Sequence, residues 1–248
     1  MGLDFIGRDL IDNSREKISS FLIPEEKMAK RPLASQKRKS IPEPTITRLP
    51  QYLRSFAEFI QRHQTVISSK ELAAASDINP AQVRKDLAYF GQFGQRGIGY
   101  GVQTLDAKMR EILGLHKVWR IALVGAGHLG TALLQYGGFS KAGFKIEAAF
   151  DVDPSKVGWE LEGVKIWATP AIRQVVREKK IEIAIIAVPA SQAQRVADDL
   201  VDGGIRAIVN FAPCVLSVPK SVLVRGVDLA SELEHLTYFL EKSRKIEK

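Results

Sequence analysis

A glycine-rich loop between residues 125 and 130 is the segment whose residue types and spacing most clearly predict chemistry. It reads Gly125-Ala126-Gly127-His128-Leu129-Gly130 and fits the pattern G-x-G-x-x-G. The loop follows the apolar run Ile121–Val124, typical of a strand buried on both faces, and it opens a helical pattern. In that context the first glycine permits a tight turn, the second lets backbone amides approach a pyrophosphate, and the third lets the helix pack against the strand. The loop therefore predicts a dinucleotide site at the start of a helix.

An acidic residue, Asp151, predicts which dinucleotide this site prefers. It follows a second apolar run, Ile146–Phe150, and lies about 20 residues after the glycine loop, the spacing expected for an acid on the adenine ribose. A carboxylate there accepts hydrogen bonds from a 2′-hydroxyl and repels a 2′-phosphate, which favours NAD(H) over NADP(H). Val188 and Pro189 close a later apolar run and are expected at the same ligand-binding edge. The alternative is a Rossmann domain that has lost its ligand.

Basic and polar side chains gather on one face of the helical pattern from Pro80 to Phe90. When Val83 and Leu87 face inward, the side chains left toward solvent or a DNA groove are Gln82, Arg84, Lys85 and Tyr89. Arginine and lysine donate to phosphates and to guanine edges, and glutamine pairs with adenine. We expect the carboxylate of Asp86 to orient a neighbouring basic side chain rather than to touch DNA. The alternative is a solvated helix with ordinary surface charges.

A glycine-rich segment follows this helix, from Gly91 to Gly101. Glycine at nearly every other position excludes a helix, and the interleaved Phe93, Ile98 and Tyr100 indicate a tight β-hairpin. Arg96 lies at the expected tip, where a wing inserts an arginine into a minor groove. A helix-turn-helix followed by a basic wing favours double-stranded DNA binding over the solvated-helix alternative.

The elements that must position these DNA-facing residues are predicted by apolar spacing and caps. A helix is expected from Thr47 to near His63, with an apolar stripe that ends at Ile60. The next elements are a strand-like run at 65–67, a helix capped by Ser68 or Ser69, a turn at 77–79, and a third helix capped by Asn79. After the hairpin, an amphipathic helix covers Val102–Leu115. This is the order of a winged helix-turn-helix domain.

From Arg120 onward, strands and helices alternate. Further strands are expected at Ile146–Phe150, Val164–Ile166, Ile183–Val188, Ala207–Asn210 and Leu223–Val227, and helices at Leu129–Tyr136, Pro170–Glu178, Ser191–Val201 and Glu232–Lys242. Such alternation predicts an α/β fold with a doubly wound parallel sheet of the Rossmann type.

Composition and length set the broad class. The chain has 248 residues, 45% of them apolar, and a formal net charge of +8. It lacks an apolar run long enough to span a membrane and holds one cysteine, Cys214, which suits a reducing cytoplasm and is interpreted as a small buried residue. We predict a disordered leader at 1–41 that includes a basic cluster, a winged-helix domain at 42–118, a Rossmann domain at 119–230, and a C-terminal helix and tail at 231–248.

Catalytic chemistry is not predicted for this chain. A dehydrogenase needs a substrate domain and an acid or base near the nicotinamide, and the residues after Arg120 suffice only for the nucleotide fold. The four histidines are scattered, no metal-ligand cluster is visible, and His128 lies in the glycine loop, where it suits phosphate or solvent. If the chain were an oxidoreductase, its catalytic residues would be missing. If it were a CoA-binding interaction module, the wing and Asp151 would have no function.

With these residues in view, the chain resembles the Rex family of redox-sensing repressors. The resemblance covers about residues 41–240. It is carried by the segments Val83-Arg84-Lys85-Asp86-Leu87, Tyr89-Phe90-Gly91, Arg96-Gly97-Ile98-Gly99-Tyr100, Asn210-Phe211-Ala212-Pro213 and Val227-Asp228-Leu229. The leader before Pro42 is longer than the family leads us to expect.

The resemblance implies a homodimer whose two winged helices bind an inverted-repeat operator. It implies that the C-terminal helix, Glu232 to Lys242, is swapped against the partner subunit, and that NAD+ permits operator binding whereas NADH closes the dimer and releases DNA. Tyr136 and Asp228 match a switch pair across subunits, with Arg54 matching an arginine that captures the aspartate in one state. Some relatives carry arginine where this chain has His128, so an arginine contact to the pyrophosphate is not expected here.

Overall fold

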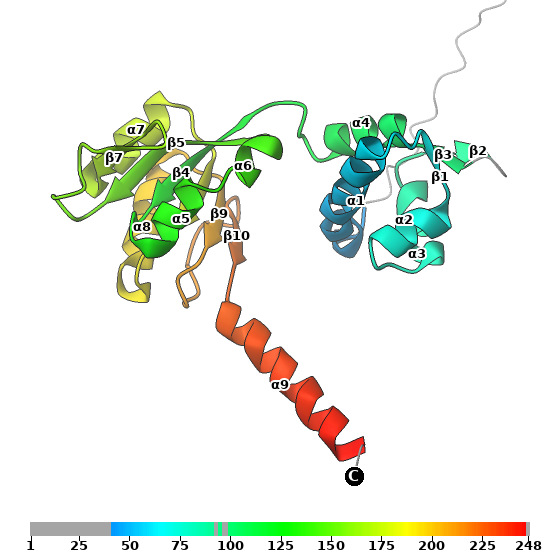
Figure 1. The fold of residues 1–248 in the computed structure, drawn as a ribbon. Coiled ribbons are helices and arrows are strands. Elements are labelled where there is room, and N and C mark those ends of the chain that lie inside the picture. The colour runs from blue at the N-terminus through cyan, green and yellow to red at the C-terminus, as the bar shows by residue number, and fades with distance from the viewer. Residues whose placement is uncertain (1–40, 92–93, 96–98, 247–248) are drawn as a thin grey trace, which may run out of the picture. The chain divides into compact units, whose positions relative to one another are not determined.

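The computed structural model describes residues 41–91, 94–95 and 99–246 of the chain. The predicted leader, 1–41, thus lies almost wholly outside the described residues. Figure 1 shows the element order, which separates a helical N-terminal part from a parallel sheet with helices. The N-terminal part contains α1 Glu43–Gln61, β1 Val66–Ile67, α2 Ser69–Ala75, α3 Pro80–Ala88, β2 Gly94–Gln95, β3 Gly99–Gly101 and α4 Val102–Ile112. This order confirms the predicted winged helix-turn-helix.

Helix caps fix the ends of α2 and α3. Ser68 caps α2 through a capping box with Glu71, in which each side chain bonds the other residue's backbone N–H. Asn79 caps α3 by accepting the N–H of Ala81, and Pro80 occupies the first helical position. Both caps were predicted from the sequence, and of the two serines considered for α2, Ser68 is the cap. Such caps are worth about 1 kcal/mol each.

The start of α1 was predicted wrongly. The helix begins at Glu43 rather than after Thr47, so Pro50 lies inside it. Pro44 falls at the second helical position, where a proline's missing N–H costs no helical hydrogen bond, and the helix therefore runs past the expected cap. The stripe packs as predicted except at its end, because Ile60 is exposed.

The wing is a small antiparallel sheet of strand order β1-β3-β2. Ile67 pairs with Tyr100, and Gly94 pairs with Tyr100 from the other side. Gly99 has a φ of +102°, and a Cβ there would press on the carbonyl of Ile67, so only glycine suits this strand pairing. The predicted hairpin is confirmed, while Arg96 lies outside the described residues.

The N-terminal part has its own apolar core. Helices α1, α2, α3 and α4 contribute the fully buried Leu49, Tyr52, Phe56, Leu72, Val83, Leu105 and Met109. Val83 and Leu87 face inward as predicted. This packing leaves the opposite face of α3 for polar side chains.

The C-terminal part is a seven-stranded sheet of order β10-β9-β8-β4-β5-β7-β6. Its strands are β4 Trp119–Val124, β5 Phe144–Asp151, β6 Glu160–Leu161, β7 Val164–Ala168, β8 Ile183–Ile186, β9 Ala207–Asn210 and β10 Leu223–Gly226. The six strands other than β6 pair in parallel, and the order reverses between β4 and β8. This confirms the predicted doubly wound sheet, whose ligands bind where the order reverses.

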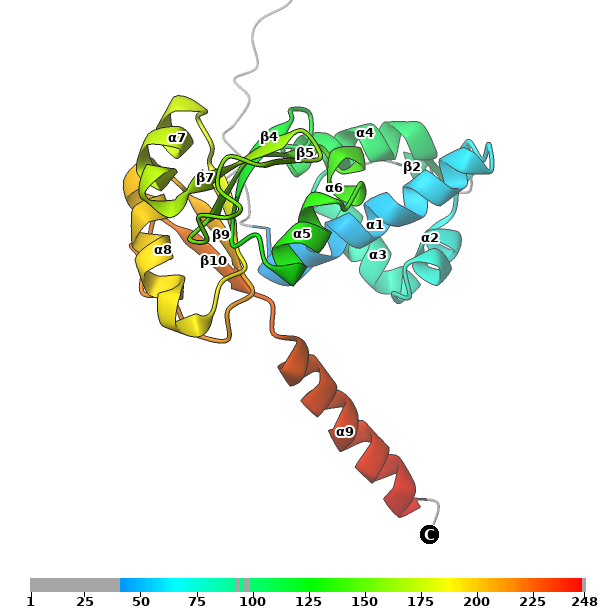
Figure 2. The same cartoon turned by 60° about the vertical axis from the view of Figure 1, so that its left-hand side comes forward.

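Two apolar cores cover the two faces of this sheet. The alternation of β4 sends Ala122 and Val124 to one face and Ile121 and Leu123 to the other. The first face packs against α7 Ile172–Glu178 and α8 Ala190–Gly203, which lie side by side in Figure 2. The second face packs against α5 His128–Leu134 and α6 Gly138–Lys141. Val209 and Phe211 belong to the second face and are only partly buried there.

Several boundaries differ from the prediction. The expected helix Leu129–Tyr136 ends at Leu134, α6 was not anticipated, and a 3-10 turn Thr169–Ala171 precedes α7. Strand β6 was also missed, although Glu162-Gly163 between β6 and β7 is a two-residue hairpin loop with both φ angles positive. An X-Gly pair flanked by strands is typical of such a turn.

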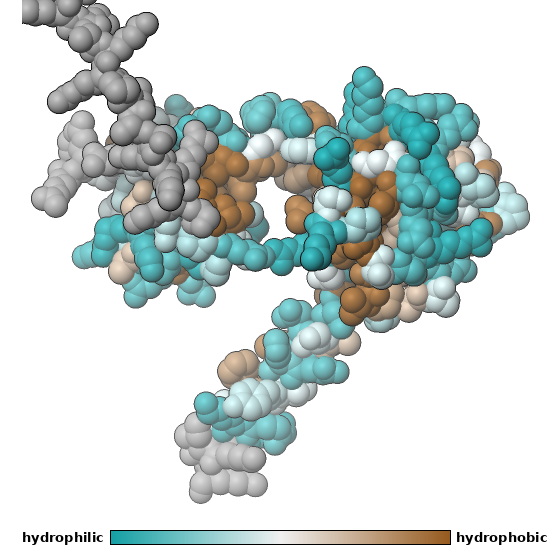
Figure 3. Space-filling model, turned by 180° about the vertical axis from the view of Figure 1, so that it is seen from behind, coloured by the Kyte–Doolittle hydropathy of each residue, from teal (hydrophilic) through white to brown (hydrophobic). Residues whose placement is uncertain are grey.

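The last helix, α9 Leu229–Ile246, begins three residues earlier than predicted and exposes its apolar side chains. The exposed residues include Leu233, Leu236, Tyr238, Phe239 and Leu240. Figure 3 shows apolar residues interspersed with hydrophilic ones along this helix. Throughout the described residues, no helix combines the length and apolarity needed to cross a bilayer.

The glycine turn between β4 and α5 follows from the close approach of backbones. Gly125 has a φ of +99°, and a Cβ there would collide with the carbonyl of Ala187 at the end of β8. A Cβ at Gly130 would collide with the carbonyl of Gly125, whereas Gly127 has open space around it. The first and third glycines are therefore needed by the fold, and the second is free to serve a ligand.

We predict that Gly130→Ala lowers the free energy of unfolding by about 1–3 kcal/mol, because a methyl group would be forced into a carbonyl. Gly127→Ala is the matched control, with an expected loss of less than about 1 kcal/mol. Urea denaturation followed by tryptophan fluorescence measures both, since Trp119, Trp159 and Trp167 all lie in the sheet domain. Equal losses in the two variants would contradict the packing argument.

Candidate functional site

A pocket lies at the carboxyl ends of β4, β5 and β8, where the strand order reverses. Val124 pairs with Phe150 on one side and Ile186 on the other, which brings the three strand ends to one edge. The pocket is lined by Val124, Gly125, Gly127, Asp151, Val152, Lys156, Thr169, Ala187, Val188, Pro189, Gln192 and Val196. Five residues predicted to bind the cofactor are in this lining: Gly125, Gly127, Asp151, Val188 and Pro189.

The carboxylate of Asp151 is held by two backbone amides. Its Oδ2 accepts the N–H of Ala126 at 2.7 Å, and its Oδ1 accepts the N–H of Asp153 at 2.9 Å. The side chain is buried, which limits its motion. A carboxylate has about four acceptor positions, so each oxygen keeps one for a ribose hydroxyl. The bond to Ala126 also ties the end of β5 to the glycine turn.

The remaining loop residues lie outside the pocket lining. Ala126 is buried and supplies its N–H to Asp151, and Gly130 is buried beneath the turn. His128 and Leu129 are exposed on the first turn of α5. Of the nine predicted cofactor-binding residues, these four therefore do not line the pocket.

Sequence reasoning missed Lys156. Its Nζ lies 3.7 Å from Asp151 Oδ2 and 3.8 Å from Asp153 Oδ2, and it lines the pocket. The ammonium group offsets part of the negative charge beside Asp151. The signal was a lysine five residues beyond the acid, which acquires meaning only once the loop after β5 is folded.

The proposed DNA-facing residues lie on or next to α3. Arg84 and Lys85 are exposed, and Arg84 also donates to Ser69 Oγ on α2 at 3.1 Å. Tyr89 is half-buried and follows the last helical residue, so the helix is shorter than the expected pattern. Gln82 is half-buried too, and its amide binds Asp86 rather than facing solvent freely.

Asp86 is fully buried and receives hydrogen bonds from two helices. From α1, the Nε and Nη2 atoms of Arg48 donate at 2.6 and 2.8 Å, Tyr52 donates its hydroxyl at 2.8 Å, and Thr45 does so at 3.0 Å. From α3, Gln82 Nε2 donates at 2.8 Å. The basic side chain that Asp86 orients is thus that of Arg48, which lies 38 positions earlier in the chain.

These contacts set the charge of the network. Burial alone would raise the pKa of Asp86, but the hydrogen bonds from Arg48, Tyr52, Gln82 and Thr45 outweigh it and lower the pKa. Burial and the bond to Asp86 together raise the pKa of Tyr52. Asp86 is therefore ionised and Tyr52 neutral at physiological pH, the combination that a charge-assisted hydrogen bond requires.

The three residues of the expected switch belong to different parts of the chain. Arg54 is exposed on α1, and Tyr136 is exposed after the end of α5. Asp228 Oδ1 accepts the N–H groups of Ala230 and Ser231 at 3.0 and 3.3 Å, so it caps α9.

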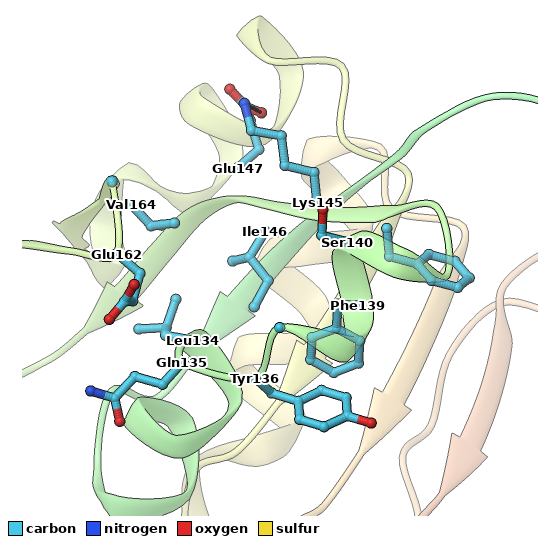
Figure 4. A pocket seen from close by; sticks show the side chains of 13 residues that line it. Leu134, Gln135, Tyr136, Phe139, Ser140, Lys145, Ile146, Glu147, Glu162 and Val164 are labelled. Carbon is cyan, nitrogen blue, oxygen red and sulfur yellow. Dashed lines mark ion pairs between the residues drawn. The ribbon is translucent and has the colours of Figure 1, made fainter. Parts of the chain in front are cut away.

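Tyr136 lines a second pocket, distinct from the one that contains Asp151 (Figure 4). This pocket lies where β5 and β7 begin, at the opposite edge of the sheet, and its wall includes Leu134, Phe139, Ile146 and Val164. The ring of Tyr136 makes an edge contact with that of Phe139, with centroids 5.1 Å apart. Within a single chain, therefore, Tyr136 does not line the pocket that contains Asp151.

Possible metal ligands and the cysteine can be located in the described part of the chain. No group of three or more His, Cys, Asp or Glu side chains there is placed to hold a metal ion. Cys214 is partly buried, and its Sγ lies 3.9 Å from the carbonyl oxygen of Ala190.

The sequence matches two family models and many known proteins. Residues 40–88 match the model described as putative DNA-binding protein N-terminus, and residues 116–214 match the CoA binding domain. A redox-sensing transcriptional repressor Rex from Chloroflexus aurantiacus is 46% identical over 203 residues, which are 82% of this chain and 96% of that protein. Its counterpart from Syntrophobacter fumaroxidans is 47% identical over 201 residues, 81% of this chain and 96% of that protein.

Solved structures give the same relationship. The crystal structure of RSP in complex with β-NAD+ and operator DNA is similar to 84% of this chain and 95% of that one, with a TM-score of 0.79 and 36% identity. The crystal structure of RSP in complex with β-NADH covers 84% of this chain and 98% of that one, with a TM-score of 0.76 and 34% identity.

We predict that Asp86→Ala lowers the free energy of unfolding by about 3 kcal/mol at neutral pH. This is the low end for breaking a buried ion pair, because Arg48 keeps 25% of its side chain exposed. Since the pKa of Asp86 is lowered on folding, its contribution is complete above the ordinary carboxyl pKa and is lost as pH falls through the lowered value. Helical circular dichroism in urea, from pH 7 down to the acid limit, measures the difference from wild type. A difference that does not shrink with acid would contradict this account.

Proposed function

The chain belongs to the Rex family of redox-sensing transcriptional repressors, and we propose that it represses transcription in response to the balance of NADH and NAD+. In this proposal NAD+ permits operator binding, and NADH closes a homodimer and releases DNA. One observation carries it: a single chain joins a pocket built from a glycine turn and Asp151 to a winged helix that exposes Arg84 and Lys85. We propose a winged-helix domain at residues 42–118, a Rossmann domain at 119–230, and a C-terminal helix and tail at 231–248. We also propose that the chain acts in the cytoplasm, where a regulator of operator DNA meets its target.

The pocket suits a nicotinamide dinucleotide. Open space at Gly127 leaves room for a pyrophosphate beside the backbone amides that begin α5. The free acceptor positions of Asp151 suit an adenine ribose, while Val188 and Pro189 border the path toward the nicotinamide at the end of β8. When bound, the dinucleotide supplies a nicotinamide ring whose charge differs between its two redox states.

The winged helix suits the major groove of DNA. Arg84 and Lys85 would contact phosphates or guanine edges, with Gln82 and Tyr89 beside them and Arg96 on the wing. A dimer would place two such helices on the half-sites of an inverted repeat.

Exposed apolar surface supports a homodimer with a swapped C-terminal helix. Leu233, Leu236 and Phe239 of α9 are more than half exposed in the single chain. Val209 and Phe211, on the second face of the sheet, are only partly covered. We propose that α9 of each subunit packs on its partner, because apolar surface of this kind is stabilised when it is buried.

The switch requires a difference in affinity between the two dimer states, since a ligand shifts an equilibrium only by that difference. Tyr136 lines a different pocket from Asp151, so a contact between Tyr136 and the nucleotide site would come from the partner subunit. We propose that Asp228 pairs with Tyr136 across subunits in one state and with Arg54 in the other. This arrangement needs no acid or base catalyst, and we propose that the chain is not an enzyme.

We predict that Arg84→Ala or Lys85→Ala weakens operator binding by about 1–3 kcal/mol and leaves NADH affinity unchanged. Lys141→Ala, on α6, removes the same charge from the sheet domain and serves as the control. Fluorescence anisotropy with an inverted-repeat operator at fixed salt measures the first quantity, and calorimetry the second. If both α3 variants bind the operator as tightly as wild type, α3 is not the recognition helix.

We predict that Asp151→Asn weakens NADH binding and narrows the preference for NADH over NADPH. The asparagine keeps an acceptor for the glycine turn but loses the charge that repels a 2′-phosphate. Asp151→Ala should do the same and also weaken the turn, while Asp153→Asn, at a half-buried neighbouring carboxylate, is the matched control. Calorimetry with both nucleotides decides it, and a wild type that prefers NADPH would show the ribose assignment to be wrong.

We predict that Asp228→Asn keeps a folded dimer and operator binding, yet loses much of the distinction between NADH and NAD+. Asparagine still caps α9, so it separates the charge of Asp228 from its cap. Asp228→Ala should lose both. Release of labelled operator is titrated with each nucleotide after the dimer mass has been checked. Wild-type selectivity in the asparagine variant would mean that Asp228 is only a cap.

A further inference from the structure

We infer that Asp86 determines DNA sequence preference without touching DNA, by holding the side-chain amide of Gln82 in one orientation. The inference rests on the proposed function, because it concerns which base pair the chain prefers once it binds an operator. Asp86 is then a positioning residue. Gln82 is the residue that contacts DNA, and it prefers a base with an amino group in the major groove.

The orientation of Gln82 follows from the chemistry of its partner. Gln82 and Asp86 are four residues apart and so share a face of α3. An ionised carboxylate only accepts hydrogen bonds, so the amide nitrogen of Gln82 must face it, as the 2.8 Å contact from Nε2 shows. The amide therefore cannot exchange its oxygen and nitrogen without losing a charge-assisted bond.

Asp86 itself has no freedom to turn. Its oxygens are fixed by Thr45, Arg48 and Tyr52 from α1, and its side chain is fully buried. These three donors from α1 remain when Gln82 is replaced, so Asp86 loses only its one donor from α3. The carboxylate is thus a fixed reference for the amide and not a partner that adapts to it.

The consequence for DNA concerns the atoms of Gln82 that Asp86 does not use. They are the acceptor Oε1 and the second N–H of the amide. Adenine offers an amino donor and an acceptor in the major groove and matches both atoms, while cytosine offers an amino donor and matches Oε1. Guanine and thymine offer acceptors on their edges and leave Oε1 without a donor. We therefore expect adenine first and cytosine second at the base pair that Gln82 contacts.

The experiment is selection from a randomised inverted-repeat DNA library with four full-length proteins: wild type, Gln82→Leu, Asp86→Asn and the double variant. Wild type should favour adenine or cytosine at one base pair of each half-site by at least about fivefold. Gln82→Leu should abolish the preference at that base pair and leave the preferences at the other base pairs unchanged. Asp86→Asn should weaken or change it at the same base pair, because asparagine presents an N–H toward Gln82 or Arg48. The double variant should match Gln82→Leu, since Asp86 acts through Gln82.

Two further variants separate this role from a merely structural one. Tyr52→Phe removes one donor to Asp86 and leaves Gln82 bound, so it should lower stability but keep the base preference. Gln82→Glu cannot donate to Asp86 and carries only acceptors, so it should move the preference toward cytosine; it tests the base contact that the inference assigns to Gln82, even if Asp86→Asn fails to fold.

The inference is overturned if Gln82→Leu leaves every base preference unchanged, or if Asp86→Asn and Gln82→Glu keep the wild-type preference. A wild-type selection that enriches no inverted repeat overturns the proposed function itself, and the two failures are therefore distinguishable.

Discussion

The turn between β4 and α5 is held in a space that accepts no side chain at two of its glycines. A Cβ at Gly125 would meet the carbonyl of Ala187, and one at Gly130 would meet the carbonyl of Gly125. The backbone N–H of Gly125 bonds the carbonyl of Phe150 at 2.8 Å, and that of Ala126 bonds Asp151. Three strand ends are thereby joined through one turn, and the pocket at their edge depends on that fit.

A different kind of interaction organises the N-terminal domain. There a buried carboxylate, Asp86, gathers donors from α1 and α3, and its bond to Arg48 is charge-assisted. Five hydrogen bonds from four residues converge on this one carboxylate, and a fully satisfied buried network of this kind specifies a single arrangement of α1 and α3. The helix that presents Arg84 and Lys85 is thus fixed by a polar interaction in an otherwise apolar core.

The sequence was most informative where the signal is local. The capping residues Ser68 and Asn79, the glycine loop and the alternating strands all act within a few positions, and the structure confirms them. The family resemblance is likewise borne out by the Rex relatives. The partners of Asp86 could not be predicted, because Thr45 and Arg48 lie 41 and 38 positions away and meet it only after packing. The approach of Lys156 to Asp151 depends in the same way on the folded loop after β5. The roles given to single residues in ligand and DNA binding remain predictions.

NADH and NAD+ are proposed to occupy the same pocket but to differ in their effect on DNA binding. The most direct measurement is an electrophoretic mobility shift of the full chain on an inverted-repeat operator, titrated with each nucleotide to saturation shown by calorimetry. We predict that NADH releases the operator, that NAD+ leaves it bound, and that added NAD+ competes with NADH and restores the complex. Equal release by both nucleotides, or release by neither, would contradict it.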